Sequence, residues 1–235
     1  MGFWSSVGSA LSSIGSAIGS AIGSIGSAVL SFASGVGASI AAVVGTVAVA
    51  AQSLGKFASI FLQALGIFKP DEKPEEVGER ALQAAGKGIT MDKFDKFDDY
   101  MKALRDFELD PEASAKRNPA EKLVAGIGVG TVGLEVKFNA APGSLHGIWL
   151  LPLSNPDYFT PERMQGLVSA GRLGGDIWGY LEKKLSDGEV RVFEKTLEAG
   201  TSDCAQLYAA LDSARGNWAE LKQQIEAKNP PTQGA

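Results

Sequence analysis

The sequence predicts an all-α protein with two unlike parts, and three observations support this. The chain has 235 residues and a net charge of −5, yet no Asp, Glu, Lys, Arg or His precedes Lys56. Large apolar residues recur three and four positions apart in both parts, which is the helical period. The stretch KPDEKPEE at 69–76 places two prolines among charged residues, which marks a boundary. We expect Gly/Ser/Ala-rich hydrophobic helices over 1–69 and a soluble, mainly helical domain over 70–235 with a disordered C-terminal tail.

A short glycine repeat begins the first part. Its units are Gly-Ser-Ala-Ile at 15 and at 19, Gly-Ser-Ile at 23 and Gly-Ser-Ala-Val at 26. Glycines four apart are typical of closely packed membrane helices. A flexible Gly/Ser linker would not place a large apolar residue on almost every turn. The predicted helix-packing and pore-lining positions are Gly15, Gly19, Gly23, Gly26, Gly35, Gly37, Gly45, Ser16, Ser20, Ser24 and Ser27.

An uncharged stretch of 23 residues follows at 29–51, which is long enough to cross a hydrocarbon core of about 30 Å as a helix. Its nine large apolar residues favour insertion by about 3–5 kcal/mol in sum, opposed by three Gly, three Ser and one Thr. Insertion is therefore favourable but marginal. The aromatic run at 57–68 suits the returning arm of a hairpin that turns near Gln52–Lys56. The alternative is that 1–69 forms the buried core of a large helical bundle.

The second part shows helix signals in succession. A helix should follow Pro74, and another should run from Thr90 to Phe107 with the acids Asp92, Asp95, Asp98 and Asp99 on a solvated face.

Further along, Asn118-Pro119 should cap a helix through AEKLVAGIGVG, with GIGVGTVGLEVKF continuing it or becoming a strand. An irregular, proline-rich segment at 141–159 precedes three helices at about 160–186, 188–199 and 202–228. Trp178 and Trp218 are expected in the core, with ligand stacking as the alternative.

Several classes of site are disfavoured. One cysteine, Cys204, and one histidine, His146, exclude an internal disulfide and the common zinc sites. No basic run exists to bind nucleic acid, and Gly126-x-Gly128-x-Gly130 lacks the spacing for nucleotide binding. No pair of residues suggests acid–base catalysis. We therefore expect no catalytic, cofactor or metal site and no enzyme activity, although His146 can titrate near neutral pH.

No signal peptide is expected, because the first residues carry no Lys or Arg and the apolar stretch is too long. Together with this start, the repeats from Gly15 and the apolar stretch 29–68 resemble the glycine-zipper pore-forming toxins of Gram-negative bacteria. These are effectors delivered by type VI secretion that depolarise a rival's inner membrane. The resemblance implies synthesis in the cytoplasm, secretion, and oligomerisation in the target membrane. It also implies two protein partners, the secretion tube protein and a membrane-bound immunity protein. It covers residues 1–69, and 70–235 resemble no family.

Two other functions fit the same pattern. Phage virion structural proteins, and phage proteins that eject DNA or penetrate membranes, are also rich in Gly, Ala and Ser and helical. A membrane-anchored enzyme is the third alternative, and it requires a cleft with perturbed titratable groups in 70–235.

The glycine repeat generates a first prediction. Replacing Gly19 and Gly23 together by leucine should weaken assembly in the membrane, because the larger side chains keep helices apart. Ion conductance across a planar bilayer measures this, and circular dichroism should show that 70–235 stay folded. A double variant that conducts like the wild type would contradict the glycine-zipper mechanism.

Overall fold

The structure is a computed structural model, and it describes Ile22 and residues 24–228. Within these residues all regular structure is helical, as predicted, with twelve α-helices, two 3-10 turns and no strand. The elements are α2 (Ser27–Ser34), α3 (Val36–Thr46), α4 (Ala48–Ala64), α5 (Pro74–Gly86), η1 (Met91–Lys93), α6 (Phe97–Asp106), α7 (Pro111–Lys116), α8 (Pro119–Lys137), η2 (His146–Trp149), α9 (Leu150–Ser154), α10 (Pro161–Ser169), α11 (Ile177–Leu181), α12 (Asp187–Glu198) and α13 (Cys204–Lys228).

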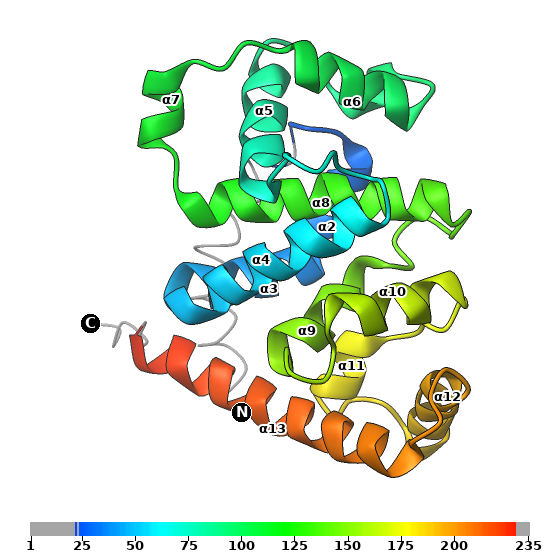
Figure 1. The fold of residues 1–235 in the computed structure, drawn as a ribbon. Coiled ribbons are helices and arrows are strands. Elements are labelled where there is room, and N and C mark those ends of the chain that lie inside the picture. Colours follow the sequence, from blue (N-terminus) through cyan, green and yellow to red (C-terminus); the bar gives the residue numbers. More distant parts are fainter. Residues whose placement is uncertain (1–21, 23, 229–235) are drawn as a thin grey trace.

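Helix α8 runs through the middle of the fold (Figure 1). Thirteen of its nineteen residues are buried, and the Asn118 side chain accepts a hydrogen bond from Ala120 N–H at its start. Helices α5–α7 lie on one side of α8 and α9–α13 on the other, with α2–α4 packed against it. The segment GIGVGTVGLEV therefore continues the predicted helix and does not become a strand.

Glycine permits backbone contact between α5 and α8. A Cβ placed on Gly78 would lie 1.9 Å from the Lys122 carbonyl oxygen, and one on Gly126 would lie 1.8 Å from the Pro74 carbonyl oxygen. No side chain larger than hydrogen fits at either position. The glycine run from Gly126 thus serves close helix packing.

Other glycines of α8 receive side chains from the first part of the chain. Gly128 faces Val29 and Phe32 of α2, whereas Gly130 faces Leu62 of α4. Each contact is close enough that an added Cβ would lie 3.0 Å or less from a side-chain atom. α8 therefore provides the surface on which both apolar helices pack.

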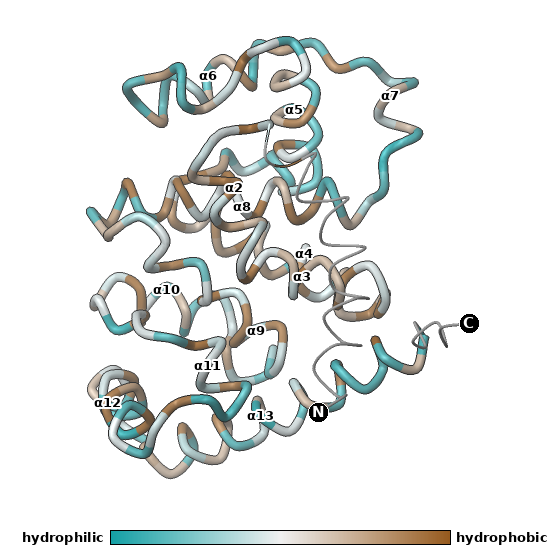
Figure 2. Tube along the Cα trace, turned by 180° about the vertical axis from the view of Figure 1, so that it is seen from behind, coloured by the Kyte–Doolittle hydropathy of each residue, from teal (hydrophilic) through white to brown (hydrophobic). Residues whose placement is uncertain are grey.

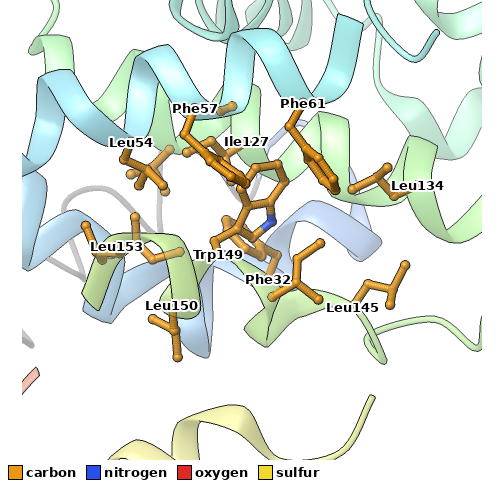
Figure 3. Packing of buried hydrophobic residues seen from close by; sticks show 14 of the residues in the cluster. Phe32, Leu54, Phe57, Phe61, Ile127, Leu134, Leu145, Trp149, Leu150 and Leu153 are labelled. Atoms are coloured by element: carbon orange, nitrogen blue, oxygen red, sulfur yellow. The ribbon is translucent and has the colours of Figure 1, made fainter. Parts of the chain in front are cut away.

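An aromatic cluster joins α4 to the η2 turn (Figure 3). The Trp149 ring is fully buried and meets the edges or faces of Phe57 and Phe61 at centroid distances of 6.2 and 5.7 Å. Its Nε1–H donates to Thr131 Oγ1 at 2.8 Å, so the one polar atom of the indole has a partner on α8.

The apolar first part belongs to the same hydrophobic cluster as the second part, from Ile22 to Ile225. Figure 2 shows hydrophobic residues concentrated on α2, α3, α4 and α8, and hydrophilic ones along α6, α7 and α13. The predicted boundary at 69–70 falls in the turn between α4 and α5. The division into two functional units stays a prediction.

The predicted hairpin turn was wrong. Residues Gln52–Lys56 lie inside α4, which runs without interruption from Ala48 to Ala64. The chain turns instead at Val47, whose extended backbone separates α3 from α4. The stretch 29–51 is also broken at Gly35, between α2 and α3.

Two predicted helices of the second part are shorter than expected. The segment from Thr90 forms the 3-10 turn η1, and the α-helix begins only at Phe97. The segment 160–186 is divided into α10 and α11, because Gly171 and Gly175 have positive φ angles of 65° and 84°. The predicted helices at 188–199 and 202–228 correspond to α12 and α13. The predicted C-terminal tail from Asn229 lies outside the described residues.

The contact between α5 and α8 generates a prediction with an internal control. Gly78→Ala should lower the free energy of unfolding by about 3 kcal/mol, because a methyl group at this crossing forces the two backbones apart. Gly86→Ala, in the same helix but with nothing within 4 Å of the added Cβ, should raise it by about 0.5 kcal/mol. Urea unfolding followed by circular dichroism measures both. Equal stabilities for the two variants would show that the crossing is not tightly packed in solution.

Candidate functional site

The candidate functional segment is the helix pair α2–α3, from Ser27 to Thr46. No single helix among the described residues is long and apolar enough to cross a bilayer, but this pair satisfies the length and composition criteria if its two helices are taken together. The helices meet at a bend of 63°, at Gly35. Straightened, twenty residues would measure about 30 Å, the thickness of the hydrocarbon core.

One face of the helix pair is buried in the body of the protein. Val29, Phe32 and Ala33 of α2 are buried, and so are five consecutive residues of α3 from Ile40 to Val44. α2 contacts α8, whereas α3 contacts α8, α13 and η2 as well as α4, the next helix of the first part. Helices from the second part thus cover the apolar side of the segment.

The exposed face of the pair lies mostly on α2 and carries no charge. Its exposed residues are Ser27, Leu30, Ser31, Ser34, Gly35 and Gly45. A surface helix of a globular protein normally presents charged or strongly polar side chains on this face. The helix pair therefore lacks the ionic groups that would oppose its transfer into lipid.

Only some of the residues predicted to pack helices or line a pore lie within the described part of the chain. Gly15, Gly19 and Gly23, with Ser16 and Ser20, lie outside the described residues.

Among the others, Gly26 closely approaches Met91, and a Cβ on Gly37 would lie 2.9 Å from the Phe32 ring. Gly35 and Gly45 are exposed, and the packing role predicted for them stays a prediction. Within the described residues, close contact between helix backbones occurs at Gly78 and Gly126.

The predicted serines also occupy the surface. Ser24 and Ser27 are both exposed. The Ser27 hydroxyl donates to the carboxylate of Asp92 at 2.8 Å. Asp92 was predicted to be on a solvated face; it is exposed, but it binds the start of α2.

A cleft of about 410 Å³ lies beside the bend. Gly35 and Val36 line one side, and His146, Ile177 and Trp178 are among the residues of the other. Lys184 Nζ lies 3.8 Å from the centre of the Trp178 ring. Trp178 was expected in the core, but it is half-buried at this cleft. Trp218 is buried in the core, as predicted, and donates to Glu182 Oε1 at 2.7 Å.

His146 is half-buried close to the bend, between α2 and α8. Its ring meets the Phe32 ring edge-to-face at a centroid distance of 5.4 Å, and its Nε2 lies 3.9 Å from Glu135 Oε1. Burial lowers the pKa of His146, and the Glu135 carboxylate opposes this only in part. The buried imidazole is therefore harder to protonate than a free one.

The chemistry available in the described part of the chain is limited. No group of three or more His, Cys, Asp or Glu side chains there is arranged to hold a metal ion. Cys204 is exposed at the start of α13, and desolvation followed by the acidic neighbours Glu198 and Asp203 raises the pKa of its thiol, which makes it a poor nucleophile. His146 does not share an element with Cys204, because it lies in the η2 turn. The expectation of no enzyme activity stays a prediction.

The chain matches no protein-family model, no curated protein and no solved structure in the comparisons made.

The environment of His146 generates a pH prediction. Because its pKa is lower in the folded protein than in the unfolded chain, the unfolded chain binds more protons as the pH falls below about 6.5. The free energy of unfolding should therefore decrease between pH 7 and pH 5.5, and no other histidine contributes. Urea midpoints measured across this range test it. His146→Gln should flatten the dependence, and an unchanged slope would assign it to other groups.

Proposed function

We propose that this chain is a pore-forming toxin that inserts its apolar N-terminal helices into a target bacterial membrane, oligomerises there and conducts ions. One observation carries the proposal: α2–α3 is an uncharged helix pair of bilayer length, bent at a glycine and held against the body of the protein. An effector of this kind must keep an insertable segment covered until it reaches lipid. Insertion then requires that α2–α3 leave α8, η2 and α13.

The exposed side of the pair supports the next step, association of inserted helices. Ser31, Ser34 and Gly35 are exposed on one turn and are all small. Lipid supplies no hydrophobic drive for helix association, so close contact between small residues and hydrogen bonds must supply it. Serine hydroxyls facing a common axis also offer ligands to a partly dehydrated ion.

The competing interpretation is that α2–α3 is only a core element of a helical bundle. Its burial fits that interpretation, because covered apolar helices occur in many globular proteins. The two interpretations differ in whether the segment ever leaves α8. A reversible covalent link between the two elements therefore separates them.

The structure provides a site for such a link. A Cβ on Gly45 of α3 would lie 3.9 Å from the Cβ of Ala120 on α8, which is the usual separation in a disulfide. The variant is Gly45→Cys with Ala120→Cys, in a Cys204→Ser background that removes the native thiol. When oxidised, this protein should give no discrete current steps in a planar bilayer, and dithiothreitol should restore them.

Each single-cysteine variant, treated with the same oxidant, is the matched control and should conduct with or without reductant. Equal currents from the oxidised and reduced double variant would show that α3 need not leave α8. No current from any form, including the wild type between pH 5 and 8, would overturn the pore-forming proposal and favour a structural role for the apolar helices.

A further inference from the structure

The N-terminal end of the helix pair is bound by a carboxylate from the second part of the chain. α2 has no acidic residue in its first turn, and its N-cap residue is Gly26, which has no side chain to cap it. Asp92 of η1 takes this role from 65 positions away. Its two carboxylate oxygens accept the Ser27 backbone N–H at 3.1 and 2.9 Å, and its Oδ1 also accepts the Ser27 hydroxyl at 2.8 Å.

The backbone reinforces this contact. Met91 N–H donates to the Ile25 carbonyl at 2.8 Å, so the chain is bound on both sides of Gly26. A Cβ on Gly26 would lie 3.0 Å from the Met91 Cβ, and its φ of 154° also favours glycine. Gly26 therefore allows the start of α2 and the η1 turn to come this close.

The C-terminal end of the pair is bound by a cation. α3 has no basic residue in its last turn. Lys228, at the end of α13, donates through Nζ to the Thr46 carbonyl at 2.6 Å, across 182 positions of sequence. α13 packs along α3, which brings the lysine to this carbonyl.

The charges of the two contacting side chains have the signs that the helix ends require. The start of a helix carries unpaired N–H groups and a partial positive charge, and the end carries unpaired C=O groups and a partial negative charge. The pair has no charge of its own with which to satisfy them. An anion and a cation from the second part meet these needs, one at each end of the segment that must be released.

We propose that Asp92 and Lys228 form a two-ended clamp that holds α2–α3 against the body, and that opening this clamp is the step that frees the pair. The role of the clamp in controlling insertion rests on the proposed function. Its role in holding α2–α3 against the body does not. Between the ends, the contacts of the pair with the second part are apolar packing and the edge-to-face contact of Phe32 with His146. Within the part of the chain that the structure describes, the clamp therefore supplies the hydrogen bonds that fix the two ends of the pair. Neither contact is buried, so competing charges in the medium can reach both.

Hydrogen exchange of the backbone amides of residues 36–44 measures opening without any membrane. Asp92→Ala should increase their exchange about fivefold, as expected for loss of a helix cap, and Lys228→Met about twofold. The double variant should increase it about tenfold, because the two contacts are far apart and act independently. Asp92→Asn keeps an oxygen acceptor without the charge and should fall between Asp92→Ala and the wild type.

The controls remove equivalent charges that lie elsewhere. Asp95→Ala takes away an exposed carboxylate three positions from Asp92, and Lys102→Met an exposed ammonium on α6. Neither should change exchange in 36–44. Amides of α8 report global unfolding and should be unaffected in the clamp variants. Exchange in 36–44 that is unchanged in the double variant, or that rises equally in α8, would overturn the clamp.

Dye release from vesicles, measured on the same proteins, separates the two proposals. Faster release by the double variant, together with faster exchange, supports both. Faster exchange with no release from wild type or variant supports the clamp and overturns the pore. Release by the wild type that the double variant does not accelerate, with unchanged exchange, supports the pore and overturns the clamp.

Discussion

Contact between the backbones of α5 and α8 fixes the position of the helix against which α2, α3 and α4 pack. At Gly78 and Gly126 the two helices approach until no Cβ fits between them. This approach places α8 in the middle of the fold, where Gly128 and Gly130 accept side chains from α2 and α4. A helix with ordinary side chains at these positions would hold its neighbours farther away and leave voids that the apolar first part does not fill.

Most helices were predictable because their signals are local. Asn118 followed by Pro119, and Ser186 with Glu189, are capping patterns that need no tertiary information, and both begin helices. The breaks were less predictable. Gly35 and Val47 lie in apolar sequence that reads as continuous, and only packing against α8 and α13 determines that the chain bends there. Propensity therefore identified the helical class but not where helices end.

The contacts at the ends of α2–α3 also could not be predicted from the sequence. Asp92 looked like one acid among several on a solvated face, because the sequence does not show which distant helix end it meets. A weak signal was present, since Gly26 precedes a helix and cannot cap it. The free N–H groups of an uncapped helix start need hydrogen-bond acceptors, from water or from elsewhere in the fold. Sequence reasoning can thus predict that a partner is needed, but the structure is required to identify it.

The order of contacts along the chain has a consequence for biosynthesis. Val29 leaves the ribosome about a hundred residues before Gly128, against which it packs, an interval of about 5–20 s at ordinary rates of translation. Throughout that interval the nascent apolar helices have no partner from α8. The contact between Thr46 and Lys228 forms later still, since 182 positions separate them. The apolar helices therefore emerge from the ribosome many seconds before the α8 surface that covers them in the folded protein.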